Sequence, residues 1–183
     1  MRVILSVAFY EDVQRAKNFV ASVSQTKNLE NVRFVFLLTG GNEPSLRISS
    51  ELLKLPRTYI KRIDGRRRKY SQVMYNKFLM ASEVCEDSDI YWNADDDYAF
   101  NPYWSDFLLH VFQENEDVNY LTLLKEKDSY TRIFFKSGFR FSFQPTSMGG
   151  AFGVRWPMFQ SHMSEWCDQH QVTDESPGTG GMF

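Results

Sequence analysis

The sequence predicts an α/β protein with a mostly parallel central sheet, helices on both faces of that sheet, and a small antiparallel β extension in its second half. Over the first hundred residues, apolar strand patterns alternate with helical patterns, as in parallel sheets built from right-handed crossovers. Strand-type segments in the second half follow one another without an intervening helix. The length of 183 residues fits one domain that buries its own core.

Three strands and two helices are expected in the first third of the chain. Strand patterns cover residues 3–9, 32–38 and 58–63. After the first strand, Glu11 and Asp12 can cap a helix whose apolar residues recur at helical spacing. After the second strand, a Thr-Gly-Gly-Asn turn at 39–42 precedes a helix over about 45–53. This strand and helix order predicts a sheet covered on both sides.

The stretch from Asp89 to Phe100 carries the main functional signal. A short apolar run over 90–92 has the composition of a buried strand and leads into Asp95, Asp96 and Asp97, here called the acidic run. Neighbouring carboxylates repel one another unless a cation neutralises them, and oxygen ligands favour Mg²⁺ or Mn²⁺ that enters with substrate phosphates. We interpret the acidic run as a metal and diphosphate site. The alternative is a solvated acidic turn that caps the next helix.

Residues that follow different strands should gather at one edge, because ligands of parallel sheets bind beyond the carboxyl ends of the strands. We expect residues 9–11, residues 39–42, Asp64 and the acidic run to meet there. A basic loop at 66–69 follows the third strand and precedes a helix from about residue 71. Its Arg and Lys side chains either bind a diphosphate or form a solvated loop.

The second half of the chain changes character. A helix is expected to start at Asn101-Pro102, with proline in the first helical position. Segments 119–125, 130–136 and 139–143 are expected to extend the sheet or to form a small antiparallel ribbon. Small residues over 146–153 indicate close approach of the backbone to a ligand, and a helix is expected from about residue 156. The segment from about 171 is either a mobile tail or an acidic lid.

Composition indicates an ordinary globular chain with an unusually aromatic core or cleft. Hydrophobic residues make up 43%, charged residues 24% and aromatic residues 16%. The formal net charge of −2 gives no overall field for nucleic acid, so no nucleic-acid partner is expected. No membrane span or signal peptide is recognised, and Cys85 and Cys167 are expected to be free, buried thiols. We therefore expect a soluble cytoplasmic protein.

These motifs together resemble the nucleotide-sugar transferases with the GT-A fold, and in particular the small family-two-like enzymes. The resemblance is carried by the aromatic loop after the first strand, by DDDYAFNPYW at 95–104 and by GGAFGVRWPMF at 149–159. It spans about residues 1–175. It implies one catalytic domain over 1–183, in which 1–100 bind the nucleotide sugar and 101–183 form the acceptor side with a flexible tail from about 171.

The resemblance implies a divalent ion, Mn²⁺ or Mg²⁺, that bridges the donor diphosphate. Asp95 and Asp97 match the spacing of a DxD-type motif and would be the metal ligands, with Asp96 also facing the donor. A second alignment places Asn93 at the first position and makes Asp95 the central ligand. Asp95 belongs to the site in both alignments.

For the donor, the resemblance implies that the loop after the first strand meets the nucleobase and that Tyr10 stacks on it. The further donor contacts that it implies come from the loop, the third strand, the basic loop and the following helix: Ala8, Phe9, Tyr10, Glu11, Asp64, Arg68, Lys69 and Asn76. Asn76 with Lys77 resembles an Arg-Asn segment of such enzymes. The chain departs from many relatives at the end of the second strand, where Thr39-Gly40-Gly41 replaces acidic residues.

The implied reaction is sugar transfer from a nucleoside diphosphate sugar, with a UDP-sugar as the expected donor, to a hydroxyl of a carbohydrate or glycoconjugate acceptor. An inverting enzyme needs a general base, for which Asp174 is the first candidate, followed by Glu175 and Asp168. A nucleotidyltransferase or a metal-dependent phosphohydrolase could use the same carboxylates. A non-catalytic carbohydrate-binding module is the alternative from another class.

Overall fold

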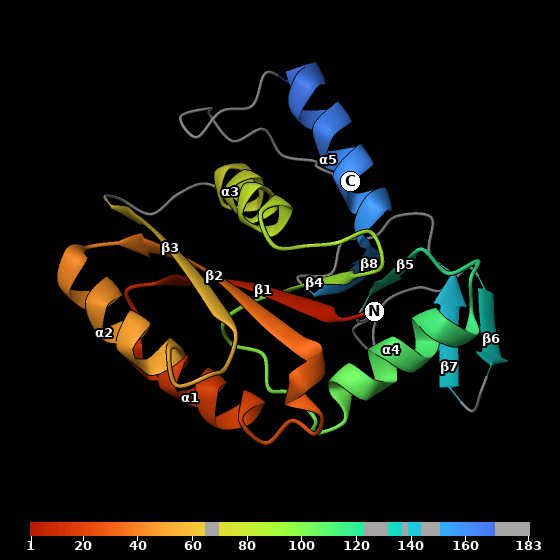
Figure 1. Ribbon diagram of the computed structural model, residues 1–183, viewed down its shortest axis with the longest axis horizontal. Coiled ribbons are helices and arrows are strands. Elements are labelled where there is room, and N and C mark those ends of the chain that lie inside the picture. Colours follow the sequence, from red (N-terminus) through yellow and green to blue (C-terminus); the bar gives the residue numbers. More distant parts are fainter. Residues whose placement is uncertain (65–69, 123–131, 137–138, 144–150, 171–183) are drawn as a thin grey trace.

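The central sheet has six strands in the order β3-β2-β1-β4-β8-β5 (Figure 1). The computed structural model describes residues 1–64, 70–122, 132–136, 139–143 and 151–170. The pairs among β1 to β4 are parallel, and β8 is antiparallel to both of its neighbours. The strands are β1 Val3–Tyr10, β2 Val32–Gly40, β3 Thr58–Asp64, β4 Ile90–Ala94, β5 Tyr120–Thr122 and β8 Phe152–Arg155. The expected α/β class and the mostly parallel sheet are confirmed.

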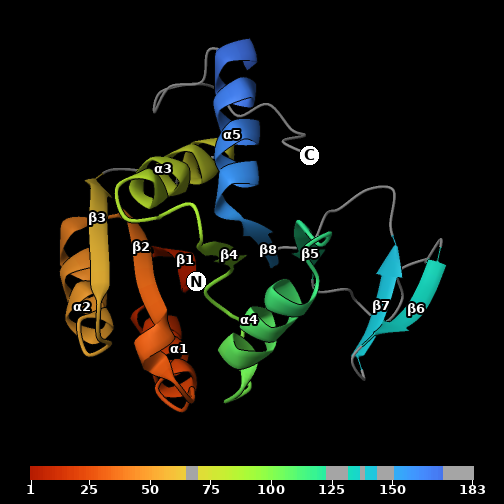
Figure 2. The same ribbon diagram turned by 45° about the vertical axis from the view of Figure 1, so that its right-hand side comes forward.

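A separate antiparallel pair is formed by β6 (Arg132–Lys136) and β7 (Phe139–Phe143). The second half therefore uses both arrangements that its sequence allows, because β5 and β8 extend the main sheet and β6 and β7 form a ribbon. Figure 2 shows this ribbon beyond the β5 edge of the sheet.

Helices cover both faces of the sheet. They are α1 Val13–Val23, α2 Asn42–Leu52, α3 Tyr70–Ser82, α4 Trp104–Glu114 and α5 Trp156–His170, with a 3-10 turn at Leu29–Asn31. Figures 1 and 2 show α3 and α5 on one side of the sheet, with α1 and α4 on the other. Among the described helices, none combines the length and the apolar character needed to cross a bilayer.

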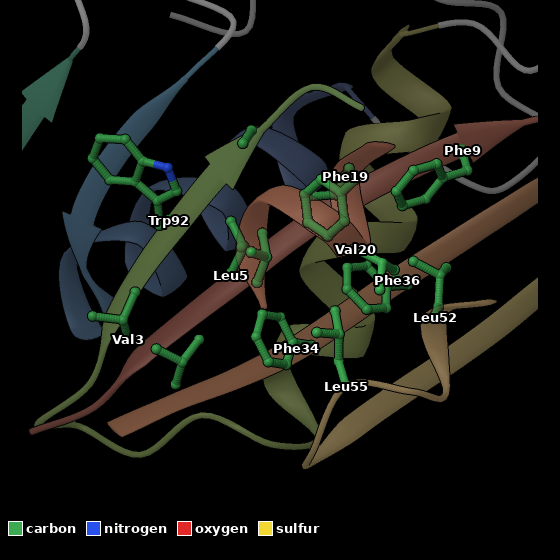
Figure 3. Close-up of a cluster of buried hydrophobic side chains, with 14 of the residues drawn as sticks. Val3, Leu5, Phe9, Phe19, Val20, Phe34, Phe36, Leu52, Leu55 and Trp92 are labelled. Atoms are coloured by element: carbon green, nitrogen blue, oxygen red, sulfur yellow. The ribbon is translucent and has the colours of Figure 1, made fainter. Parts of the chain in front are cut away.

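The core follows the two-residue alternation of β1. Val3, Leu5, Val7 and Phe9 pack against the side of α1, α2 and α4, whereas Ile4 joins the cluster on the side of α3. Around Phe9, Figure 3 shows a group of aromatic rings between the strands and α1. The rings of Phe9 and Phe19 meet edge to face with centroids 5.4 Å apart, and Phe19 meets Phe36 at 5.6 Å. The high aromatic content thus fills the core.

Two helices begin at positions that differ from the sequence prediction. Helix α2 starts at Asn42, ahead of the expected residue 45, because Gly41 adopts the extended N-cap conformation and Pro44 is tolerated in the first turn. Helix α4 starts at Trp104, after the predicted Asn101-Pro102 start. Here the side-chain oxygen of Asn101 accepts a hydrogen bond from the Tyr103 backbone N at 2.9 Å, which forms a turn before the helix.

The small residues over 146–153 predict a loop close to a ligand. The end of this segment that the structure describes has a different role. Phe152 and Gly153 lie in β8, inside the sheet, while residues 144–150 lie outside the described residues. A Cβ on Gly153 would sit 2.5 Å from the ring of Trp92 on the paired strand. Glycine is required at this position because the Trp92 ring packs directly on the β8 backbone.

Both cysteines are free thiols and partly buried. Cys85 follows the end of α3, although the sequence pattern placed it on the helix, and Cys167 lies on α5. Burial raises the pKa of each thiol, so neither cysteine has the thiolate character of a nucleophile.

Candidate functional site

A cleft of about 400 Å³ opens at the carboxyl edge of the parallel strands. It is enclosed by the ends of β1, β2 and β4, by the first turn of α1 and by the beginning of α3. This is the position at which α/β sheets bind ligands. The side chains and backbone that line it belong to Ala8, Phe9, Tyr10, Asp12, Arg15, Thr39, Val73, Met74, Lys77, Asn93, Ala94, Asp95 and Asp96.

Lys77 is the buried cation of the cleft. Only 2% of its surface is exposed, and its ammonium donates to the side-chain oxygen of Asn93 and, at 3.5 Å, to the Ala94 carbonyl. Burial lowers the pKa of Lys77 to about 7, against a smaller raising effect of the Asp95 charge. The lysine therefore ties α3 to the end of β4 and places a titrating amine beneath the acidic run.

Asp95 stands at the mouth of the cleft. Loss of hydration around its carboxyl raises the pKa of Asp95, nearby Lys77 opposes this rise, and the charges of Asp97 and Asp96 add to it. Burial and the charges of Asp95 and Asp97 also raise the pKa of Tyr98. A cation at this point would relieve the repulsion among the carboxylates.

Arg15 forms ion pairs with the acidic run from the first turn of α1. Its Nη1 lies 2.9 Å from Asp96 Oδ1 and 4.0 Å from Asp97 Oδ2, and its Nε lies 3.4 Å from Asp12 Oδ2. Asp12 is also the N-cap of α1, because its Oδ1 accepts from the Arg15 backbone N at 2.9 Å. The hydrogen bond to Asp96 and the surrounding carboxylates raise the pKa of Arg15.

Glu11 holds the neighbouring turn in place. Its backbone has φ 55°, an unusual value for a non-glycine residue, and its Oε1 accepts from the Gly41 backbone N at 2.7 Å. Its side chain lies against Gly40, where an added Cβ would be 2.6 Å from Glu11 Cγ. Gly40 and Gly41 thus make room for a carboxylate that comes from the β1 loop.

The structure places the predicted site residues in three groups. Five line the cleft: Ala8, Phe9, Tyr10, Asp95 and Asp96. Four lie elsewhere among the described residues: Glu11 on the turn, Asp97 with 62% of its side chain exposed, Asn76 buried in α3, and Asp168 exposed near the end of α5. The Asn76 amide donates to the Gln72 carbonyl at 2.9 Å.

The other five predicted site residues belong wholly or by their side chains to the part of the chain outside the described residues. Arg68, Lys69, Asp174 and Glu175 lie in segments 65–69 and 171–183, outside the described residues. Asp64 ends β3 in register with Gly40, and its side chain also lies outside the description.

Sequence reasoning did not assign Arg15 to the site and left Lys77 as a resemblance only. A signal for Lys77 was available, because it falls between Met74, Phe78 and Ala81 on a helix face that is otherwise apolar. A lysine on such a face is either paired or functional. For Arg15, the signal was its position in the first turn after a strand that ends at the predicted site.

The donor set suits a hard divalent ion that shares its ligands with a substrate. The acidic run offers oxygen atoms only, and burial, with smaller effects of the Asp97 and Asp96 charges, raises the pKa of Asp95. Within the described residues, no group of three or more His, Cys, Asp or Glu side chains converges as a metal site. An ion here would therefore need further oxygen ligands, such as those of a diphosphate.

Among solved structures, S. aureus TarS 1–349 is similar to 96% of this chain with a TM-score of 0.66 and 9% identity. The chain adopts the GT-A fold. The mannosyltransferase PcManGT from Pyrobaculum calidifontis, in complex with GDP-Man and Mn²⁺, is similar to 68% of the chain with a TM-score of 0.52 and 12% identity. No family model and no curated protein matches the sequence.

The GT-A fold of this chain spans 51% of TarS 1–349 and 36% of PcManGT. The 4-diphosphocytidyl-2C-methyl-D-erythritol synthase of Anaerococcus prevotii is similar to 99% of the chain and 79% of its own length, with a TM-score of 0.53 and 8% identity. The same arrangement of strands thus occurs in glycosyltransferases and in a nucleotidyltransferase.

Proposed function

We propose that this protein transfers a sugar from a nucleoside diphosphate sugar, with a UDP-sugar as the expected donor, to a hydroxyl of a carbohydrate or glycoconjugate. The observation that carries the proposal is the cleft, which joins the end of β1 to the acidic run in a GT-A fold. All of its lining residues belong to the first 100 positions, which supports the proposal that residues 1–100 bind the donor and 101–183 form the acceptor side. TarS in complex with UDP-GlcNAc supports this class of donor.

Asp95 and Asp97 are the proposed ligands of Mn²⁺ or Mg²⁺. When bound, the ion would neutralise the charge that develops on the departing nucleoside diphosphate. The exposed side chain of Asp97 is free of the packing that restrains Asn93. Because the Asn93 oxygen already accepts from Lys77, the pair of Asp95 and Asp97 is favoured over Asn93 and Asp95.

The donor's nucleotide is proposed to bind along the end of β1. Tyr10 exposes 37% of its surface at the cleft and can stack on a nucleobase, next to Ala8 and Phe9. Lys77 places positive charge at the back of the cleft, where a diphosphate would approach Asp95 and Asp96. Additional donor contacts proposed from the sequence are Glu11, Asp64, Arg68, Lys69 and Asn76.

The acceptor's proton is proposed to leave to Asp174, with Glu175 and Asp168 as the alternatives. This assignment comes from the resemblance, since a base after the segment around Gly153 would face the sugar acceptor. An Asp174→Asn variant that transfers sugar at the wild-type rate would exclude this residue.

A panel of sugar nucleotides tests the proposal directly. Thermal unfolding is measured with UDP-, GDP- and CDP-linked sugars, each with and without Mn²⁺, because a ligand at about one hundred times its dissociation constant adds about 2.7 kcal/mol of stability. We expect a metal-dependent rise in the melting temperature with at least one nucleotide. A protein that binds carbohydrate alone, with no metal-dependent affinity for nucleotides, would be a binding module instead.

The acidic run is tested in the same assay with Asp97→Asn. The loss of one metal ligand is expected to remove the metal-dependent part of the shift and to reduce transfer at least tenfold. Asp87→Asn is the matched control, since Asp87 lies in the turn before β4, away from the cleft-lining residues. If Asp97→Asn keeps both metal-dependent binding and transfer, the metal assignment is wrong.

A nucleotidyltransferase is the second candidate, favoured by the similarity to 4-diphosphocytidyl-2C-methyl-D-erythritol synthase over most of both chains. The products separate the two reactions. Release of nucleoside diphosphate that an acceptor sugar accelerates indicates glycosyl transfer. Release of pyrophosphate from a nucleoside triphosphate with a phosphorylated alcohol indicates nucleotidyl transfer.

A further inference from the structure

Arg15 is the side chain that brings positive charge to the outer rim of the cleft. It lines the cleft, and half of its side-chain surface is exposed. Three carboxylates surround its guanidinium: Asp96 at 2.9 Å, Asp97 at 4.0 Å and Asp12 at 3.4 Å. Two of these belong to the acidic run, which is 81 positions away in sequence at Asp96.

An arginine in this position competes with a metal ion. Of the two proposed metal ligands, Asp97 has its Oδ2 4.0 Å from Arg15 Nη1, and the hydrogen bond to the neighbouring Asp96 at 2.9 Å holds the guanidinium there. A divalent ion that binds the acidic run also meets the repulsion of the guanidinium a few ångströms away. Because the Arg15 side chain is half exposed on a helix surface, it can rotate away without disturbing the core.

We propose that Arg15 is the resident counter-ion of the acidic run, that a divalent cation displaces it, and that the displaced guanidinium then binds the donor diphosphate. This inference rests on the proposed function and adds a coupling between its two ligands. Metal alone binds weakly, because the ion must take Asp97 from Arg15 and lie close to the guanidinium, and nothing replaces the contact that Arg15 loses. Metal and nucleotide together bind more tightly, because the diphosphate gives the guanidinium new oxygen partners.

The decisive measurement is the affinity for Mn²⁺ alone. Free Mn²⁺ is followed by electron paramagnetic resonance during titration of the wild-type chain, of Arg15→Gln and of Arg47→Gln. Arg47 is an exposed residue of α2 that is not among the cleft-lining residues, so its variant matches the change in net charge. We expect Arg15→Gln to bind Mn²⁺ about tenfold more tightly than the other two proteins. An affinity within twofold of Arg47→Gln, or no Mn²⁺ binding by any of the three, overturns the proposal.

The second measurement tests the coupling. The dissociation constant of Mn²⁺ is determined with and without UDP. The coupling ratio is the constant without UDP divided by the constant with UDP, and it is expected to be at least fivefold smaller in Arg15→Gln than in the wild type. If the wild type binds nucleotide with Mn²⁺ and Arg15→Gln has the same ratio, the proposed function stands and this inference is wrong. Tighter Mn²⁺ binding by Arg15→Gln without any nucleotide binding removes the proposed function and retains the counter-ion role. Thermal unfolding confirms that each variant is folded.

Discussion

The buried side chains on the two faces of the sheet differ next to the cleft. On the side of α1, α2 and α4, buried Phe9, Phe19 and Phe36 contact one another and the core is apolar. On the side of α3, near the cleft, buried Lys77 and Asn93 contact each other between the helix and the sheet. Buried polar groups cost stability unless they are paired, so they are retained where a site needs them. The α3 side also has an aromatic cluster of its own, in which Tyr91 and Phe159 stack with centroids 4.3 Å apart, so both faces supply stability. The buried polar pair marks the part of the α3 side that borders the cleft.

The largest effect is expected at Phe36, in the aromatic core on the side of α1 and α2. Phe36→Ala removes a fully buried ring that packs on Phe9, Phe19 and Phe34, and should lower the free energy of unfolding by about 3–5 kcal/mol. Leu53→Ala is the control, because Leu53 is 64% exposed and its change should stay within about 0.5 kcal/mol. Urea denaturation measures both. Equal losses in the two variants would contradict the core role of Phe36.

Lys77→Met tests the buried polar pair of Lys77 and Asn93 and should separate stability from binding. At pH 7 we expect the free energy of unfolding to change by less than about 1.5 kcal/mol, because a side chain of similar length replaces a poorly hydrated cation. Affinity for a nucleoside diphosphate should fall at least tenfold. A variant that loses stability but keeps nucleotide affinity would make Lys77 a structural residue.

The same variant carries a pH signature. In the unfolded chain a lysine takes up its proton near pH 10.4, whereas folded Lys77 does so only at a pKa of about 7. Between these values the unfolded chain binds more protons, so the stability of the wild type relative to Lys77→Met rises with pH by up to about 1.4 kcal/mol per unit. This gain in stability is lost as the pH falls from about 10 to 7. Lys17→Met, at an exposed position on α1, should show no such slope in urea denaturation between pH 7 and 9.

The smallest effect is expected at Ser6, on the same face of β1 as Ile4. Its hydroxyl is fully buried and has no hydrogen-bond partner within the described part of the chain. Ser6→Ala should therefore leave the free energy of unfolding unchanged or raise it by up to about 1 kcal/mol. A loss above about 1 kcal/mol by calorimetry would show that this hydroxyl is paired.

Much of the fold could be predicted from local patterns. The strands from 3, 32, 58 and 90 follow from short apolar runs, and the position of the acidic run follows from the rule for parallel strands. The place of β8 between β4 and β5 did not follow, because its Phe-Gly-Val-Arg sequence resembles a loop until Trp92 is seen against Gly153. Strand order in space is set by such non-local contacts.

The site was predictable by region and less so by residue. Ala8 and Tyr10 lie in the last residues of β1, and Asp95 directly follows β4, so their place at the edge of the sheet is visible in the sequence. Arg15 and Lys77 reach the same cleft from helices, and their direction depends on how α1 and α3 pack on the sheet. Charge alone cannot indicate this, since the chain contains 21 Lys and Arg residues.

The register of β1 with β4 has a consequence for how the protein folds. Val3 is paired with Ile90, so the central strands join the two ends of the donor half of the chain. Closing a loop of this size costs chain entropy before any contact rewards it, and folds with such contacts form slowly. The cleft therefore forms only once β4 has paired with β1, because both strands line it. Nucleotide binding during refolding would report the pairing of β1 with β4, and shorter amino-terminal fragments that end before β4 should bind no donor.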